Sequence, residues 1–411
     1  MPSFSERRRY SCAPWNPRCS SLAAVNDHVA LRAGIPPFYV MDVWLAAAER
    51  QRTHGDLVNL AAGQPSAGAP APVRAAAMAA LERNQLGYSV ALGIPELREA
   101  IAASYRDRYA ISVGVDDVVL TTGSSGGFLL AFLSCFDVGD RVALASPGYP
   151  CYRNILSALG CEVVEIECGP DTRFQPTAAM LAGLDPPVQG VIVASPANPT
   201  GSMLDEAALR RLVAWCRANG VRVISDEIYH GITYGKEAVT MAALDPAAVV
   251  INSFSKYYSM TGWRLGWMVV PEDLLRTTEC LAQNLFISPP TLSQFAALGV
   301  FDCTAELEAN VARYRENRDI LLEGLPRCGF GPFAAADGAF YIYAGIEAFG
   351  ADSAALAREI LETAGVAVTP GIDFDAGAGG RFMRFSYAGS GEEMREAVRR
   401  LQSWSQGRNR R

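Results

Sequence analysis

Lysine is almost missing from this sequence of 411 residues. Of its 36 lysines and arginines, only Lys236 and Lys256 are lysines, so arginine supplies nearly every cation. A lysine that persists against such a bias can do what arginine cannot, because a desolvated lysine loses its proton and becomes a neutral nucleophile. Lys256 lies in a serine-rich segment that follows an apolar run at residues 247–251. A solvated surface lysine is the alternative interpretation of this position.

Several other features are absent, and each absence excludes a class of protein or site. No pair of the ten cysteines has the CxxC spacing of a zinc or redox site, and the three histidines show no metal-ligand spacing. No apolar run reaches the roughly 18 residues that a membrane-spanning helix needs. The net charge of −7 argues against nucleic-acid binding. We therefore expect a cytoplasmic protein with reduced thiols, no bound metal, no membrane contact and no nucleic-acid partner.

The sequence does contain enough apolar residues for a large core. Half of the residues are hydrophobic and 19% are charged. Strand patterns alternate with helical patterns through the middle of the chain, which predicts an α/β fold with a large, mostly parallel sheet covered on both faces. We expect a disordered N-terminal extension at 1–25, an arm and helix that belong to the small domain at 26–65, the large domain at 66–300 and an α+β small domain at 301–411.

The segment around Lys256 carries the most specific motif of the chain. It runs from Ser253 to Gly266 and places Ser253 three residues before the lysine and Arg264 eight residues after it. Hydroxyl and guanidinium groups are natural partners of a phosphate monoester. The segment resembles the lysine motif of the fold-type I aminotransferases of class I/II, which use pyridoxal 5'-phosphate (PLP). This resemblance implies that Lys256 forms a Schiff base with the cofactor and that Ser253 and Arg264 bind its phosphate.

A glycine- and serine-rich turn supplies a second part of the expected phosphate site. The turn Gly123–Gly127 follows an apolar strand and precedes a helix predicted to begin at Phe128. Free N–H groups and the positive end of the helix dipole converge at such a point and attract anions. By resemblance, Ser124 and Ser125 bind the phosphate, and Tyr88 reaches the phosphate of the neighbouring subunit, which implies a homodimer with shared active sites. A packed aromatic residue in a turn is the alternative for Tyr88.

Four further residues correspond to family positions around the cofactor ring. Tyr149 matches an aromatic residue that stacks on the pyridine ring. Asn198 and Tyr229 match groups beside the phenolic oxygen of the cofactor. Asp226 follows an apolar strand at 221–225, at the end of a sheet where ligands bind, and matches the carboxylate that keeps the pyridine nitrogen protonated. A turn residue is the alternative for Asn198, and a helix N-cap is the alternative for Asp226.

The substrate side of the site is expected to include an arginine. Arg384 is the single cation in a strand of apolar and aromatic residues, and a guanidinium is the natural partner of a planar carboxylate. By resemblance, Arg384, Gly63 and Asn198 bind the substrate; an arginine that reaches water is the alternative for Arg384. Ser125 stands where some relatives have a lysine for acidic side chains, which favours a neutral or aromatic substrate. The glycines of Gly371–Gly380 predict a mobile loop that can serve as a lid.

Together these motifs imply a PLP-dependent aminotransferase with the fold of type I PLP transferases. The large domain would bind PLP, and the enzyme would move an amino group between an amino acid and a 2-oxo acid by a ping-pong mechanism, with Lys256, Asp226 and Tyr229 as catalytic residues. The resemblance covers about residues 36–401. A lyase, cyclase or C–C bond-forming enzyme of the same fold is the first alternative, since the cofactor motifs hardly discriminate between these reactions. A PLP-sensing transcription regulator is rejected because residues 1–25 cannot supply a DNA-binding module.

Overall fold

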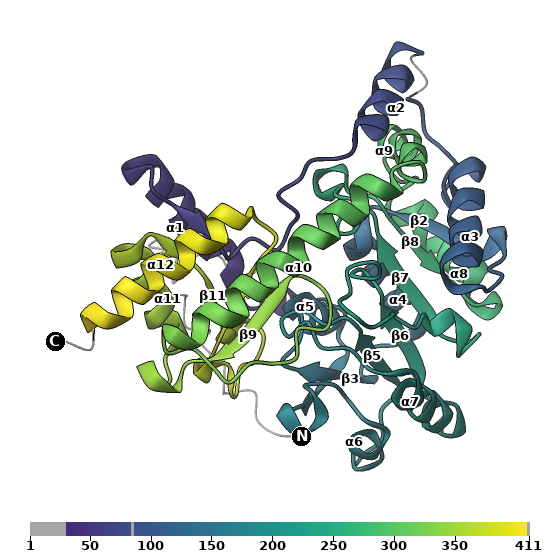
Figure 1. The fold of residues 1–411 in the computed structure, drawn as a ribbon. Helices are drawn as coiled ribbons and strands as arrows, with labels where there is room; N and C mark the ends of the chain where they lie inside the picture. Colours follow the sequence, from purple (N-terminus) through teal and green to yellow (C-terminus); the bar gives the residue numbers. More distant parts are fainter. Residues whose placement is uncertain (1–29, 84–85, 409–411) are drawn as a thin grey trace.

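A seven-stranded sheet forms the centre of the larger lobe in the computed structural model, which describes residues 30–83 and 86–408 (Figure 1). The strand order is β2-β8-β7-β6-β5-β3-β4, and β8 alone runs antiparallel to its two neighbours. The mostly parallel sheet predicted from the sequence is therefore confirmed. The strands are β2 (Val118–Thr121), β3 (Arg141–Ser146), β4 (Glu162–Glu167), β5 (Gly190–Ala194), β6 (Arg222–Asp226), β7 (Val249–Ser253) and β8 (Gly266–Val269).

Helices cover both faces of this sheet because successive strand residues point to opposite sides. In β5, Ile192 packs with α4, α5 and α8, whereas Val191 and Val193 pack with α6 and α7. Both faces are apolar, so the strands read as continuous hydrophobic runs. The helices of this lobe are α3 (Pro95–Tyr109), α4 (Gly123–Cys135), α5 (Pro150–Leu159), α6 (Ala178–Ala182), α7 (Glu206–Asn219) and α8 (Glu272–Leu285).

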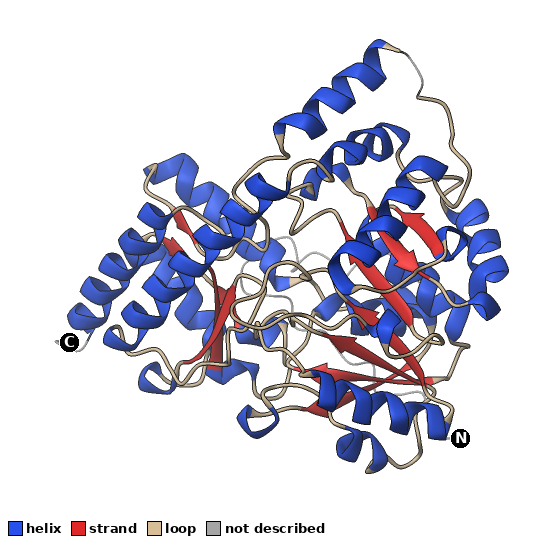
Figure 2. Cartoon of the chain, turned by 45° about the vertical axis from the view of Figure 1, so that its right-hand side comes forward, coloured by secondary structure: helices blue, strands red, loops and turns tan. Residues whose placement is uncertain are grey.

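A smaller lobe lies beside the first (Figure 2) and combines an early segment, 39–59, with a late one, 341–408. Its antiparallel sheet has the order β11-β12-β9, and β1 pairs in parallel with β10. These elements are β1 (Val58–Asn59), β9 (Tyr341–Gly345), β10 (Val366–Ala367), β11 (Thr369–Pro370) and β12 (Phe382–Ser386), with helices α1 (Tyr39–His54), α11 (Ser353–Ala364) and α12 (Gly391–Arg408).

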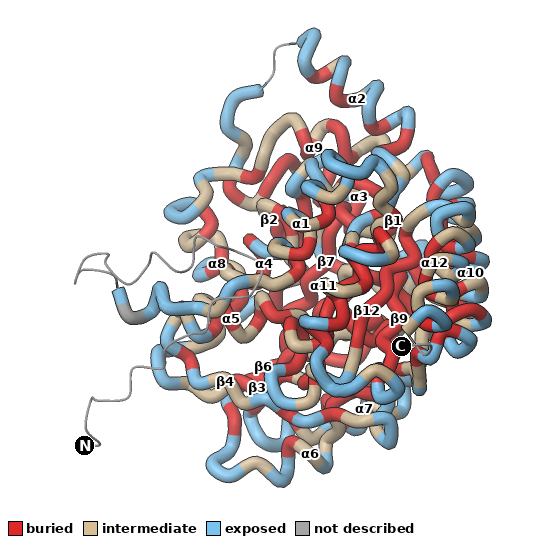
Figure 3. The backbone as a smooth tube through the Cα atoms, turned by 90° about the vertical axis from the view of Figure 1, so that its left-hand side faces the viewer, coloured by how far each residue is buried: buried red, intermediate tan, exposed pale blue. Residues whose placement is uncertain are grey.

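Three helices lie outside these layers. The long α10 (Thr304–Arg327) runs from the side of α9 (Thr291–Ala297) toward the small lobe (Figure 1). The helix α2 (Ala71–Glu82) packs on α9 at one end and projects from the body of the protein (Figure 3). The buried residues are concentrated in and around the strands. Among the described residues, no helix combines the length and the apolar composition that crossing a bilayer requires.

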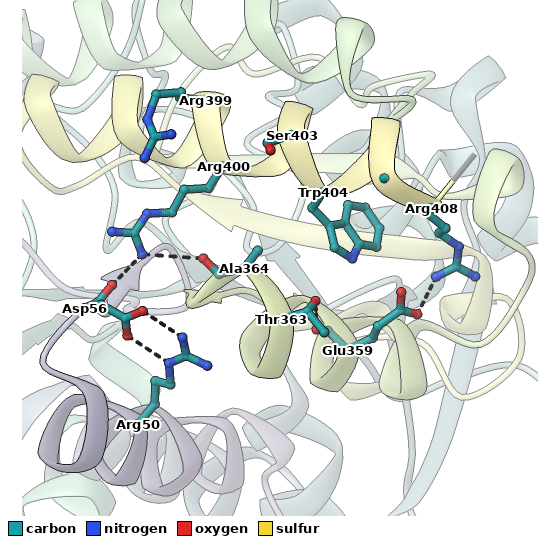
Figure 4. Close-up of a pocket in the computed structure, with 11 residues that line it drawn as sticks. Arg50, Asp56, Glu359, Thr363, Ala364, Arg399, Arg400, Ser403, Trp404 and Arg408 are labelled. Carbon is teal, nitrogen blue, oxygen red and sulfur yellow. Dashed lines mark hydrogen bonds and ion pairs between the residues drawn. The ribbon is translucent and has the colours of Figure 1, made fainter. Parts of the chain in front are cut away.

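Arginines tie the far end of the small lobe together around a hollow of about 550 Å³ (Figure 4). Arg50 pairs with the Asp56 carboxylate, and Arg408 pairs with Glu359. Arg400 donates to the backbone oxygens of Asp56 and Ala364. These charged groups have partners within the protein, so we interpret the hollow as a structural junction of α1, α11 and α12.

Two sequence expectations about local structure are wrong, and a third lies outside the described residues. The helix α4 begins at Gly123 instead of Phe128, because the Gly/Ser segment forms its first turns. Gly371–Gly380 is a packed segment: the Cβ of any residue other than glycine at position 371 would lie 2.4 Å from the backbone oxygen of Gly379. These glycines permit a close backbone approach and do not indicate a lid. The extension predicted at 1–25 falls outside the residues that the structure describes.

Candidate active site

A cavity of about 640 Å³ lies where the carboxyl ends of the large-lobe strands meet the small lobe. Ligands of open α/β sheets bind at this end of the strands. Ten of the twelve residues singled out from the sequence line this one cavity. They are Gly63, Ser124, Ser125, Tyr149, Asn198, Asp226, Tyr229, Lys256, Arg264 and Arg384.

Lys256 projects into the cavity from the segment that follows β7. Its Nζ donates a hydrogen bond to the backbone oxygen of Gly63 at 2.6 Å and lies 5.8 Å from the centre of the Tyr229 ring. Burial lowers the pKa of Lys256 to about 8; Arg384 and Arg264 act in the same direction, and Asp226 opposes them. A substantial share of this amine is therefore neutral near physiological pH, as a nucleophile requires.

The start of α4 presents unsatisfied backbone donors beside a guanidinium. The N-cap residue Thr122 makes no side-chain capping bond, so the first N–H groups of the helix, including those of Ser124 and Ser125, have no capping side chain. Arg264 stands over this turn, with its Nη2 2.5 Å from the position that a Cβ on Gly123 would take. Arg264 forms an internal hydrogen bond to the Thr261 oxygen at 3.0 Å. The arrangement suits a phosphate group.

Ser253 lies beneath the cavity and not on its wall. Its hydroxyl donates to Ser255 Oγ at 2.8 Å, and it also lies 3.1 Å from the Leu265 oxygen. Ser255 lines the cavity instead. The resemblance assigned a phosphate-binding hydroxyl to Ser253, and that role stays a prediction; in the structure the turn after β7 presents Ser255 to the cavity, and the Ser253 hydroxyl contacts Ser255.

Asp226 ends β6 with both carboxylate oxygens engaged. Oδ1 accepts the N–H of Ile228 at 3.0 Å, and Oδ2 accepts the hydroxyl of Tyr152 from α5. Burial raises the pKa of Asp226 to about 6, and the bonds from Tyr152 and Ile228 and the charge of Lys256 act against that rise. The carboxylate is therefore ionised at neutral pH. Sequence reasoning missed Tyr152, although it follows Tyr149 by three residues, a spacing that brings two side chains to one helix face.

Arg384 is a buried cation whose hydrogen bonds go to neutral acceptors. It is 2% exposed and donates to Asn198 Oδ1 at 2.9 Å, to the Ala61 oxygen at 2.9 Å and to Thr369 Oγ1 at 3.2 Å. Its Nε is buried without a partner, and no carboxylate pairs with it among the described residues. A buried guanidinium without a counter-ion is a strong site for a ligand carboxylate.

Aromatic rings frame both the arginine and the lysine. The Arg384 guanidinium lies 4.4 Å from the ring centre of Tyr341 and 4.8 Å from that of Phe374. The hydroxyls of Tyr229 and Tyr341 are 2.8 Å apart. Tyr149 packs edge to face with Tyr152 at 5.3 Å, so its ring is held at the cavity wall. Sequence reasoning missed Tyr341, because nothing in its strand distinguishes it from the neighbouring aromatic residues.

Tyr88 does not line the cavity of its own chain. Its side chain is 83% exposed, and it lies in the segment between α2 and α3. An exposed aromatic residue of this kind is suited to contact another molecule. The placement is compatible with the expected role across a dimer interface.

The N-terminal arm forms one wall of the cavity, which the sequence did not reveal. Phe38, Val40, Met41 and Trp44 line the cavity from the start of α1. Phe38 packs edge to face on Tyr149 with the ring centres 5.9 Å apart. The sequence predicted only an arm and a helix here, because the partner surface comes from residues far along the chain.

Comparison with known proteins finds aminotransferases throughout. A family model described as aminotransferase class I and II matches residues 55–401. The valine–pyruvate aminotransferase of Mycobacterium tuberculosis is 64% identical over 92% of this chain and 99% of its own length. The aspartate/prephenate aminotransferase of Thermus thermophilus is 33% identical over 86% of this chain and 92% of its own length.

Solved structures agree with these matches. The crystal structure of an aminotransferase from Mycobacterium tuberculosis has a TM-score of 0.91 and 63% identity, and the alignment covers 93% of this chain and 100% of that one. Aspartate aminotransferase from Thermus thermophilus with maleate has a TM-score of 0.85 and 32% identity, and the alignment covers 91% of this chain and 99% of that one.

Proposed function

Since the chain belongs to the class I and II aminotransferases and transfers an amino group between an amino acid and a 2-oxo acid, we propose that the cavity around Lys256 is its active site. We also propose that the preferred amino donor has a neutral, apolar side chain. The observation that carries this proposal is a partly buried amine with a lowered pKa in one cavity with two guanidinium groups, Arg264 and Arg384. Each guanidinium is placed to hold one anionic group.

The residues present fit PLP, the cofactor of this family. The start of α4 and Arg264 would hold the phosphate, Tyr149 would stack on the ring, and Asp226 would face the pyridine nitrogen. When bound, PLP supplies an aldehyde for Lys256 and a ring that takes up the electrons of the substrate Cα–H bond. The fit rests on Arg264, which has no carboxylate partner among the described residues, and on an ionised Asp226 that would keep a ring nitrogen protonated.

Lys256 then moves the proton of the reaction. With the cofactor bound, the Nζ amine of Lys256 would take the proton from the substrate Cα and later give it back, because its lowered pKa lies near the operating pH. The hydroxyl of Tyr229 contacts that of Tyr341, and the Tyr229 ring lies close to Nζ. Tyr229 would therefore help to orient the amine of Lys256. Arg384 would hold the substrate carboxylate and thereby orient the substrate Cα toward Lys256.

The walls favour an apolar side chain on the substrate. The cations among the described lining residues are Lys256, Arg264 and Arg384, which leaves none for a side-chain carboxylate once the phosphate and the α-carboxylate are bound. The relative that is 64% identical is named for valine and pyruvate. We propose a small or branched aliphatic amino acid as donor and pyruvate as acceptor.

We also propose that two copies of the chain form a homodimer that shares its active sites. Tyr88 is 83% exposed, and Met78, Leu81 and Val90 on the same projecting region are at least half exposed. Apolar side chains on an element that stands away from the body suit an interface (Figure 3). Tyr88 would then reach the phosphate end of the neighbouring cavity.

The free thiols of the described cysteines suit a reducing compartment, and we propose that the protein is cytoplasmic.

The two lysines of the chain provide a matched test. Protein supplied with PLP, valine and pyruvate should form alanine and the 2-oxo acid of valine in equal amounts. The Lys256→Ala variant should lose this activity by about a thousandfold or more. The Lys236→Ala variant should keep it, because Lys236 is half-exposed and pairs with Asp337 at 3.0 Å. Unchanged turnover in Lys256→Ala, or release of ammonia or carbon dioxide in place of alanine, would refute the proposal.

A further inference from the structure

The cavity wall at the start of α1 has no cap of its own. The N-cap residue Phe38 is extended and makes no side-chain capping bond. The first N–H groups of a helix need acceptors, because the helix itself offers none. The acceptor here comes from the small lobe, 333 residues further along the chain.

Asp373 accepts the first N–H groups of α1 with both of its carboxylate oxygens. Oδ1 accepts the N–H of Tyr39 at 3.1 Å, and Oδ2 accepts the N–H of Val40 at 3.1 Å. Asp373 is fully buried. Burial raises the pKa of Asp373 to about 6, against the effects of Arg384, the two amides and Arg153, so the group carries its charge at neutral pH. A carboxylate at a helix N-terminus also gains from the helix dipole.

The segment that carries Asp373 touches both binding regions of the cavity. The Asp373 backbone oxygen accepts Arg153 Nη2 of α5 at 2.8 Å, and the Phe374 oxygen accepts the N–H of Gly148, next to Tyr149, at 3.0 Å. The Phe374 ring lies against Arg384. One short segment therefore joins the expected carboxylate site, the aromatic residue of the cofactor site and the apolar wall.

We propose that Asp373 is a positioning residue for substrate specificity, which holds the first turn of α1 so that Phe38, Val40, Met41 and Trp44 close on the side chain of the amino donor. Asp373 is absent from the cavity lining, so it acts through α1 and not by contact. The inference rests on the proposed function, because it concerns the donor of the same site. Under this proposal a branched side chain would contact this wall, whereas the single methyl group of alanine would be too short to fill the same space.

The test is a comparison of donors in the Asp373→Asn variant loaded with PLP. The substitution removes the charge and one of the two acceptors, so the KM for valine should rise about tenfold. The KM for alanine should rise less than about threefold, and the affinity for PLP should stay unchanged. Tyr39→Pro is a second variant that leaves Asp373 in place and removes one N–H; proline suits this first helical position, and we expect about a threefold rise for valine alone.

The matched control is Asp352→Asn. Asp352 caps α11 of the same lobe by accepting the N–H of Ala355 at 2.9 Å, and it does not line the cavity. This variant should lose thermal stability while keeping the KM of both donors. Parallel rises for valine and alanine in Asp373→Asn, or no rise in either variant at α1, would overturn the inference. Failure of the proposed function would appear separately, as absence of valine-dependent alanine formation by the unaltered protein.

Discussion

Asp226→Asn should make the cofactor-free protein more stable while it destroys activity. The carboxylate is buried, and its pKa is raised from an ordinary value of 3.8 to about 6, chiefly by burial. A raised pKa means that the folded protein holds this proton more tightly than the unfolded chain does. The associated stability is fully present below pH 3.8 and is lost as the pH rises to about 6. Above that window, the fold bears the cost of a buried charge.

The magnitude follows from the size of that rise. About two pH units at about 1.4 kcal/mol each give about 3 kcal/mol in the free energy of unfolding at pH 7.5, and about half as much at pH 5. For a chain of this length, about 3 kcal/mol corresponds to about 3 °C in Tm. Asparagine has the same shape, keeps an oxygen for the Ile228 N–H and carries no charge.

The assay is thermal unfolding of cofactor-free protein at pH 5 and pH 7.5, together with transamination of the loaded enzyme. We expect a gain in Tm that grows with pH, and a loss of activity of about a hundredfold or more, because the substitution removes the carboxylate that we propose keeps the ring nitrogen protonated. Asp245→Asn is the control: Asp245 is also buried but pairs with Arg217 at 2.9 Å, so its loss should lower Tm. A lower Tm for Asp226→Asn at pH 7.5, or a gain independent of pH, would refute the reasoning.

The remaining predictions concern the three cations that line the cavity. Only the neutral amine of Lys256 attacks an aldehyde, and its pKa is lowered to about 8, so the rate of PLP uptake should rise with pH up to about 8 and then level off. Rapid absorbance measurements between pH 6 and 11 test this prediction. A rate that continues to rise up to pH 10 would contradict it. Arg384→Lys should raise the KM for the amino donor about a hundredfold, since lysine cannot form two parallel hydrogen bonds to a carboxylate. A donor KM unaffected by this substitution would rule out the carboxylate role. Arg264→Lys should instead weaken PLP binding.

The cofactor side of the site could be predicted because its residues lie in short, local motifs. The lysine segment and the glycine–serine turn each keep their spacing within one strand-to-loop junction, so position in the sequence translates into position at the end of the sheet. The reaction class, amino-group transfer and not the lyase or cyclase alternative, is confirmed by the relatives. The role of each site residue stays a prediction.

The parts that could not be predicted depend on contacts between distant segments. Tyr152 meets Asp226 across 74 residues, and Asp373 caps α1 across 333. Neither contact leaves a pattern in its own neighbourhood. The glycines at 371–380 were misread because glycine serves mobility and tight packing equally well, and only the facing backbone of Gly371 and Gly379 decides between them.

The antiparallel pairing of β7 and β8 has a mechanical consequence. Ser253 lies opposite Gly266 in this pair, so Lys256 and Arg264 both belong to the connection at its tip. The proposed anchor for the aldehyde and the proposed anchor for the phosphate are therefore separated by a fixed length of one braced loop. Arg384 belongs to the other lobe, on β12. Displacing one lobe against the other would change the distance from Arg384 to Lys256 and Arg264, while the distance between Lys256 and Arg264 would stay constant.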